Sequence, residues 1–266
     1  MNGCHRRVIR LDIAIVTGAS SGLGGEYVRQ LDEKEKFDEI WIIARHKDKL
    51  DALAGRVKTK TRVLPYDLTD KEAIKKIAAL LEQEKPHVRL LINAAGFGKI
   101  GSYDDILLVD CENMIELNCR ALVEMTQITL KYMTHGDRIM EISSTSAFQP
   151  FQYLDVYAAT KAFVFRYSRA LRVELFGRGI KLTAVCPYWI KDTAFIPTAQ
   201  KTKDSAYIRH FPLASHEKTV ASVSLRDSRM GFAVSTPGII CTVHRIVAKF
   251  IPSELMMGLW ALLRRI

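Results

Sequence analysis

Tyr157 and Lys161 are the residues whose types and spacing most directly suggest chemistry. They stand four positions apart in the segment YAATK at 157–161, so a helix would place both on one face. A free phenol has a pKa of about 10, which makes it a poor proton donor and acceptor near neutral pH. A nearby ammonium group favours the phenolate, so we expect Lys161 to lower the pKa of Tyr157. The pair predicts acid–base catalysis, although a bare Y-x-x-x-K pattern is common by chance.

Ser144 and Asn118 are candidate partners of that pair. Ser144 follows an apolar run at 138–143, and Asn118 precedes a helical pattern. A serine hydroxyl at a strand end can donate a hydrogen bond to a substrate oxygen and stabilise the charge that develops on it. For Asn118, helix capping is the alternative interpretation. We interpret the neighbours Ser143, Thr145 and Ser146 as ordinary capping residues.

A glycine-rich segment, TGASSGLG at 17–24, follows the first apolar run and opens a helical pattern. Glycines allow a backbone to approach a pyrophosphate closely, and a helix N-terminus offers free N–H groups and the positive end of its dipole. The segment therefore predicts a dinucleotide site. The expected contacts are Gly18, Ser20, Ser21, Gly22, Leu23 and Gly24.

Arg45 stands where the second apolar run ends, at the position that distinguishes the two nicotinamide cofactors. An acidic residue there would bind the ribose hydroxyls of NAD, whereas an arginine accommodates a 2′-phosphate. No acid is present, and His46 and Lys47 follow Arg45. Because a guanidinium can pair with phosphate through two hydrogen bonds, we expect NADP(H) to be preferred over NAD(H). A solvated cation at a helix start is the alternative.

The T-G-x-x-x-G-x-G spacing, together with the tyrosine–lysine pair, resembles the short-chain dehydrogenases/reductases. This resemblance implies that Ser144, thirteen residues before Tyr157, and Asn118 complete a catalytic tetrad. It implies that Lys161 also binds the nicotinamide ribose and that Asn118 holds a water which links Lys161 to solvent.

The same resemblance implies further cofactor contacts after later strands. Asp67 and Leu68 correspond to residues that hold the adenine. The segment NAAG at 93–96 resembles the family's N-N-A-G, with Ala94 in place of the second asparagine. The segment PYWIKDT at 187–193 resembles P-G-x-x-x-T, with Tyr188 in place of glycine, a departure that puts the path of this loop in doubt. The expected contacts are Asp67, Leu68, Asn93, Ala94, Gly96, Tyr157, Lys161, Pro187, Ile190 and Thr193.

Short apolar runs alternate with longer helical patterns along most of the chain. The runs lie at 13–17, 39–44, 61–66, 89–93, 138–143 and 181–186, and helices are expected at 22–32, 70–84 and 158–176. This alternation predicts one α/β domain over 1–266, a Rossmann-type doubly wound parallel sheet with helices on both faces. Ligands bind beyond the carboxyl ends of such strands, where all the motifs above fall.

The last third of the chain should form the substrate end. We expect loop and short helices at 188–230 as a lid, a last strand at 232–235, and helices at 238–250 and 253–264. The many aromatic residues of the lid predict an apolar pocket for a bulky ketone or secondary alcohol, steroid-like or acyl. Packing of the lid over a small polar substrate is the alternative. The tail at 238–266 is apolar with a basic end, and suits a membrane surface, the mouth of the pocket or a subunit interface.

Composition excludes several classes of protein. The 266 residues are 48% hydrophobic with five scattered cysteines, which argues against a disulfide framework or a zinc site and suits the cytoplasm. The net charge of +10 has no recognisable nucleic-acid module around it. The sequence thus predicts an NADP(H)-dependent homo-dimeric or homo-tetrameric oxidoreductase. A 3-oxoacyl reductase of lipid synthesis, and an NADP(H)-sensing protein without turnover, are the alternatives.

Overall fold

The computed structural model describes residues 10–208, 211 and 213–264, so the last two residues of the basic tail lie outside it. Within these residues the strands are β1 (Asp12–Thr17), β2 (Glu39–Ile43), β3 (Thr61–Leu64), β4 (His87–Asn93), β5 (Arg138–Ile142), β6 (Lys181–Val185) and β7 (Val234–Ser235). The main helices are α1 (Gly22–Lys34), α2 (Lys47–Ala54), α3 (Lys71–Glu84), α4 (Leu108–Ile115), α5 (Leu122–Leu130), α6 (Asp155–Glu174), α7 (Phe195–Ala199), α8 (Glu217–Met230), α9 (Ile239–Phe250) and α10 (Ser253–Leu263).

The strands of the described residues form one seven-stranded parallel sheet in the order β3-β2-β1-β4-β5-β6-β7. The order reverses beside β1, as in other doubly wound folds. Strands β1, β2 and β5 are almost entirely buried, which explains their continuous apolar runs. The predicted Rossmann-type sheet is confirmed, with strand ends that differ by one or two residues.

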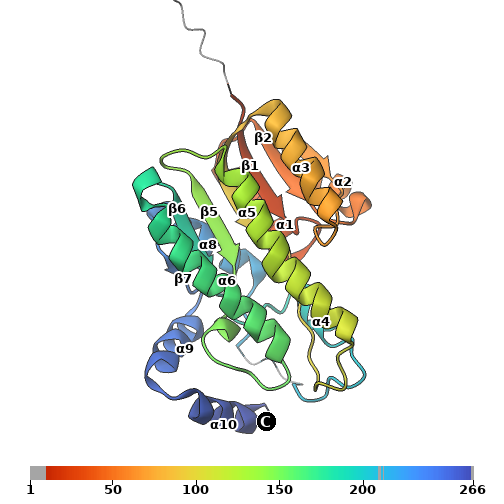
Figure 1. The fold of residues 1–266 in the computed structure, drawn as a ribbon, viewed down its shortest axis with the longest axis vertical. Coiled ribbons are helices and arrows are strands. Elements are labelled where there is room, and N and C mark those ends of the chain that lie inside the picture. The colour runs from red at the N-terminus through yellow and green to blue at the C-terminus, as the bar shows by residue number, and fades with distance from the viewer. Residues whose placement is uncertain (1–9, 209–210, 212, 265–266) are drawn as a thin grey trace, which may run out of the picture.

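Helices cover both faces of the sheet (Figure 1). On one face, α3, α5 and α6 pack through residues such as Ile77, Met125 and Leu171. On the other, α1, α2 and α8 pack through residues such as Tyr27 and Leu225. Two apolar layers of this kind hold the strands rigidly, and their carboxyl ends carry the candidate site.

Helix α8 corrects the expectation of only loop and short helices at 188–230. It runs for 14 residues and packs against α1, where the Tyr27 hydroxyl lies 2.7 Å from the Ser224 hydroxyl. Its buried side includes Val220, Ala221 and Ser224, but most of its other residues are polar. The small and polar members of that stripe hide the apolar periodicity on which a sequence-based prediction depends.

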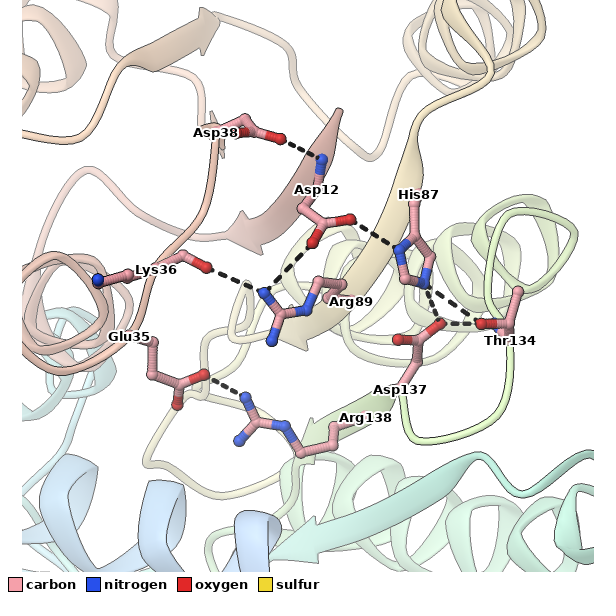
Figure 2. A network of polar contacts seen from close by, with 9 residues as sticks. All are labelled: Asp12, Glu35, Lys36, Asp38, His87, Arg89, Thr134, Asp137 and Arg138. Carbon is pink, nitrogen blue, oxygen red and sulfur yellow. Dashed lines mark hydrogen bonds and ion pairs between the residues drawn. The ribbon is translucent and has the colours of Figure 1, made fainter. Parts of the chain in front are cut away.

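A polar network lies at the amino-terminal ends of β1 and β4, opposite the carboxyl ends that carry the candidate site (Figure 2). His87 on β4 lies 2.8 Å from a carboxylate oxygen of Asp12 and 2.9 Å from one of Asp137. Arg89 donates to Asp12, and Arg138 pairs with Glu35 at the end of α1. These contacts join three strands and a helix far from the candidate site, so their role is structural.

The chain ends in the predicted helices α9 and α10, which meet at Pro252 (Figure 1). No helix among the described residues is both long enough and apolar enough to cross a membrane.

Candidate active site

The glycine segment forms a tight turn between β1 and α1. Gly18 has a φ of +69°, and a Cβ there would lie 2.8 Å from backbone atoms of Ala95. A Cβ on Gly24 would collide with the carbonyl oxygen of Gly18. Helix α1 begins with no side-chain cap at Ser21 and no acidic residue in its first turn. Its N-terminal N–H groups are therefore available to an anion.

A cavity of about 400 Å³ runs along the carboxyl ends of the strands. It is lined by most of the residues that the sequence singled out: Gly18, Ser20, Ser21, Gly22, Leu23, Gly24, Arg45, Asp67, Leu68, Ala94, Gly96, Ser144, Tyr157, Lys161, Pro187, Ile190 and Thr193. A Cβ on Gly22 would lie 3.3 Å from the Thr193 side chain, so the loop after β6 approaches the glycine turn closely. The two predicted residues outside this lining are Asn93 and Asn118.

One end of the cavity is basic. Arg45, His46 and Lys49 line it, and Arg45 Nη1 lies 3.8 Å from Asp67 Oδ2. Both partners are largely exposed, so this ion pair is weak and leaves the guanidinium free to bind another anion. The sequence analysis did not identify Lys49. Its position four residues after Arg45, in the first turn of α2, could have indicated it.

Ser144 and Tyr157 line the cavity between its basic end and its aromatic end. The Ser144 hydroxyl accepts from the N–H of Ser146 at 3.1 Å. Burial raises the pKa of Tyr157 above its ordinary value, and the nearby Ser144 hydroxyl opposes that rise. The protein groups alone therefore keep the phenol protonated, and the lowered pKa stays an expectation for the complex with the oxidised cofactor, whose nicotinamide ring adds a second positive charge.

Lys161 lies beside Tyr157 without forming a direct hydrogen bond to its hydroxyl among the described contacts. Its Nζ is 5.8 Å from the centre of the tyrosine ring and donates to the carbonyl oxygen of Ile142 at 2.8 Å. Burial lowers the pKa of Lys161 to about 8, so the ammonium form still predominates at neutral pH. A Cβ on Gly96 would lie 3.3 Å from Nζ, which explains the need for glycine there.

Asn118 organises the site from behind. It lies in a π-helical turn, Glu116–Ala121, and its side chain is fully buried. Its Oδ1 accepts from the N–H of Phe97 at 3.1 Å, and its Nδ2 donates to the carbonyl of Phe97 at 2.9 Å and to Thr160 Oγ1 at 3.0 Å. The side chain thus fixes the segment after β4 against α6 and does not itself line the cavity.

Asn93 is the other predicted residue outside the lining, and its side chain points into the core rather than into the cavity. Its Nδ2 donates to Glu141 at 3.1 Å and to Thr126 Oγ1 at 3.0 Å. Glu141 is fully buried on β5, and burial raises its pKa to about 7 although both neighbours donate hydrogen bonds to it. The sequence analysis did not single out Glu141. An acidic residue within an otherwise apolar strand could have indicated it.

The cavity beyond Tyr157 is predominantly aromatic. Its lining there includes Phe97, Phe151, Leu154, Tyr188, Trp189, Phe195 and Trp260. Trp260 comes from α10 and packs edge-on against Phe151, with ring centres 5.1 Å apart. A Cβ on Gly98 would lie 2.7 Å from the Tyr157 ring, so this glycine lets the segment after β4 pass close to the phenol. The arrangement suits an apolar molecule whose reacting oxygen lies near Ser144 and Tyr157.

Comparison with known proteins agrees with this geometry. Residues 12–204 match the short chain dehydrogenase family. An uncharacterized oxidoreductase of Staphylococcus epidermidis is 28% identical over 181 residues, 67% of this chain and 78% of the relative. A very-long-chain 3-oxoacyl-CoA reductase of Anas platyrhynchos is 30% identical over 212 residues, 74% of this chain and 66% of that enzyme.

Solved structures show the same fold. A short-chain dehydrogenase from Sphingobium yanoikuyae in complex with NADPH has a TM-score of 0.75 and 25% identity, and the match covers 91% of this chain and 97% of that one. A second short-chain dehydrogenase, from Streptomyces avermitilis, has a TM-score of 0.75 at 21% identity, covering 96% and 97%. With the family matched over most of its length, the chain belongs to the short-chain dehydrogenase family and is an NAD(P)-dependent oxidoreductase.

Proposed function

We propose that the protein interconverts a bulky, apolar ketone and the corresponding secondary alcohol with NADP(H) as its cofactor. The observation that carries this proposal is the continuity of the cavity. One hollow joins the basic end at Arg45, the glycine turn, the Ser144–Tyr157 pair and the aromatic end at Trp260. A cofactor and a substrate can therefore meet beside the phenol.

The residues at the basic end fit a phosphorylated dinucleotide. Arg45 and Lys49 supply positive groups where a 2′-phosphate would lie, and the N-terminus of α1 faces the position of the pyrophosphate. Lys161 has N–H donors left after its bond to Ile142, and these suit ribose hydroxyls. When bound, the nicotinamide supplies the hydride for the carbonyl carbon.

The chemistry of the proton follows from the protein groups. In the direction of reduction, the protonated Tyr157 hydroxyl gives its proton to the carbonyl oxygen, and Ser144 donates a hydrogen bond to the same oxygen. The Lys161 ammonium then stabilises the phenolate that remains. In the direction of oxidation, the phenolate takes the proton of the alcohol.

A 3-oxoacyl reductase is the second candidate. The relative from Anas platyrhynchos acts on very-long-chain 3-oxoacyl-CoA, and the aromatic end of the cavity would also suit an acyl chain. An NADP(H)-sensing protein without turnover is disfavoured, because such a protein has no need to keep Ser144, Tyr157 and Lys161 together in one cavity.

We also propose that the protein forms a homo-oligomer. Helices α4 and α6 contact each other and expose Leu108, Ile115 and Phe163 on the surface of the described residues. An apolar face on two adjacent helices is typical of a subunit interface. We expect a homo-dimer or homo-tetramer through this face, which sedimentation of the purified protein measures.

The test is a screen of NADPH oxidation against steroid, acyl-thioester and small ketones, repeated with NADH. We expect turnover of bulky ketones with NADPH, and a KM for NADPH that rises at least about tenfold in Arg45→Ala/Lys49→Ala while the KM for NADH changes little. Preference for acyl thioesters over free ketones would select the second candidate. Equal use of NADH by the wild-type protein would overturn the cofactor assignment.

A further inference from the structure

Helix α9 presents an apolar stripe to the outside of the molecule. Ile239, Val243, Ile246 and Phe250 follow one another at spacings of four, three and four residues, so they lie on one face of the helix. All four are at least half exposed, with Ile239 and Phe250 above 80%. The opposite side of the helix carries the buried Cys241. A surface helix normally buries its apolar stripe, so this one is reversed.

Helix α10 continues this apolar surface. Leu255, Leu259 and Leu262 follow at spacings of four and three residues and are exposed. The other side of α10 carries Met256, which is buried, and Trp260, which lines the cavity. Two successive helices thus turn leucine, isoleucine and phenylalanine outward. We call these seven exposed residues of α9 and α10 the tail surface: Ile239, Val243, Ile246, Phe250, Leu255, Leu259 and Leu262.

The tail carries more basic than acidic residues. Between residues 236 and 264 the sequence has Arg245, Lys249 and Arg264, with Glu254 as its one acidic residue. Lys249 is exposed and lies next to Phe250, at the border of the apolar stripe, whereas Arg245 lies on the Cys241 side of α9 and Arg264 lies over the Tyr153 ring. The whole chain has a formal net charge of +10. The surroundings therefore attract an anionic partner.

We propose that the tail surface binds peripherally to an anionic lipid membrane, with α9 and α10 lying in the plane of the interface. Apolar side chains on one face and basic side chains beside them are the two features that hold a helix at a lipid surface. The tail lies at one end of the molecule, beyond the sheet, so it can meet a flat surface before the body of the protein does (Figure 1). Neither helix spans the membrane.

A lipid surface fits this region better than a second copy of the chain. In a two-fold symmetric contact through the tail surface, Lys249 of each copy would be brought to the interface, with Glu254 alone to offset it. Anionic headgroups instead neutralise Lys249. The apolar face of α4 and α6 already offers a separate interface between copies.

The position of α10 also suggests how the substrate reaches the cavity, and this consequence rests on the proposed function. Helix α10 has the lipid-facing leucines on one side and Trp260 at the cavity on the other. A lipophilic ketone dissolved in the membrane would thus meet the aromatic end of the cavity across a single helix.

The experiment measures sedimentation of the full-length protein with vesicles. One set is phosphatidylcholine alone and the other contains phosphatidylglycerol as well. We expect binding to the anionic set and binding at least about tenfold weaker to the neutral set. Ile246→Asp/Phe250→Asp should weaken binding to the anionic set by a further factor of about ten or more. Phe176→Asp is the matched control, because Phe176 is 86% exposed and lies outside the tail surface; it should bind as the wild type does.

Three results would overturn the proposal. These are no binding to anionic vesicles, equal binding by Ile246→Asp/Phe250→Asp, and a dimer in solution that this double substitution dissociates. The last result would assign the tail surface to a second copy of the chain. NADPH oxidation with a soluble ketone should be unchanged in the double variant. A protein that binds the vesicles but reduces no ketone would contradict the proposed function and leave this inference standing.

Discussion

The sequence pattern indicates Tyr157 as the acid–base residue, and the surrounding structure gives it two further properties. It is buried, which keeps its hydroxyl protonated, and it lines the cavity together with Ser144. Lys161 lies beside the ring and donates to a strand carbonyl. Its contribution is therefore electrostatic and increases once negative charge forms on the phenolate.

Removal of the Tyr157 hydroxyl should abolish turnover. In Tyr157→Phe the ring can keep its contact with Phe195, so the fold and the nucleotide end should be intact. We expect kcat to fall at least about a hundredfold, because no other group lies ready to donate the proton. Affinity for NADPH, measured by fluorescence titration, should stay within a few-fold. Retention of a tenth of the wild-type activity would refute the assignment.

Glu141 should make stability depend on pH. Its pKa is about 7 in the folded chain against an ordinary value of 4.5, so the folded state holds a proton that the unfolded state releases between these values. Stability from this group is therefore present at pH 4.5 and below, and is lost as the pH rises through 7. Because glutamine does not ionise, Glu141→Gln removes this loss of stability at high pH. Denaturant unfolding should show the variant to be more stable than the wild type at pH 8, by up to about 3 kcal/mol, and the gain should shrink toward pH 5.

Glu39→Gln is the control, because it is expected to behave in the opposite way. Glu39 is buried on β2, and burial alone would raise the pKa of its carboxyl. Bonds from Lys60, Trp41 and Arg62 nevertheless hold that pKa below its ordinary value. This carboxylate therefore stabilises the fold above its ordinary pKa, and that contribution is lost as the pH falls through the lowered value. A variant that gained stability at pH 8 would contradict this account of buried acids.

At the scale of elements, the join between β1 and α1 determines where the cofactor can lie. The turn crosses over the segment after β4 at a distance that leaves no room for a Cβ on Gly18. The Thr17 hydroxyl accepts from the N–H of Ala95 at 3.0 Å and holds the two segments together. The glycine motif is therefore needed for the packing of the β1–α1 turn against the segment after β4 as much as for contact with a ligand.

Gly24→Ala tests this packing. The added Cβ would collide with the Gly18 carbonyl oxygen, so we expect a loss of about 1–3 kcal/mol in the free energy of unfolding. Affinity for NADPH should fall at least about tenfold, because the turn must move. Gly55→Ala is the control: its nearest neighbour would be the Asp51 carbonyl at 3.6 Å. If both variants lose the same stability, crowding at Gly24 is not the cause.

At the scale of the whole molecule, the site depends on segments from both ends of the chain. The glycine turn comes from the first 24 residues, the Ser144–Tyr157 pair from the middle, and Trp260 from the last helix. Parallel strands bring their carboxyl ends to one edge, which places the first two together. Helix α10 then folds back so that Trp260 reaches Phe151.

Trp260→Ala should impair bulky substrates selectively. Loss of the indole widens the aromatic end of the cavity and removes its contact with Phe151. We expect KM for a bulky ketone to rise about fivefold to tenfold, with kcat and KM for a small ketone unchanged. Leu262→Ala, an exposed position on the other side of α10, should leave both unchanged. A uniform loss for all ketones would point to unfolding of the tail instead.

The sequence alone determined the sheet, the glycine turn and the positions of Ser144, Tyr157 and Lys161, because these depend on local periodicity and on motifs with constant spacing. It did not reveal α8, whose buried stripe is partly serine and aspartate, nor the direction of the Asn93 side chain, which alternation along β4 and a buried acid on β5 decide together. It did not reveal that burial raises the pKa of Tyr157 in the protein by itself, since desolvation depends on every surrounding segment. Only the tertiary structure decided that Trp260 completes the cavity while the leucines of the same helix face outward, because which side of a helix is buried depends on what packs against it.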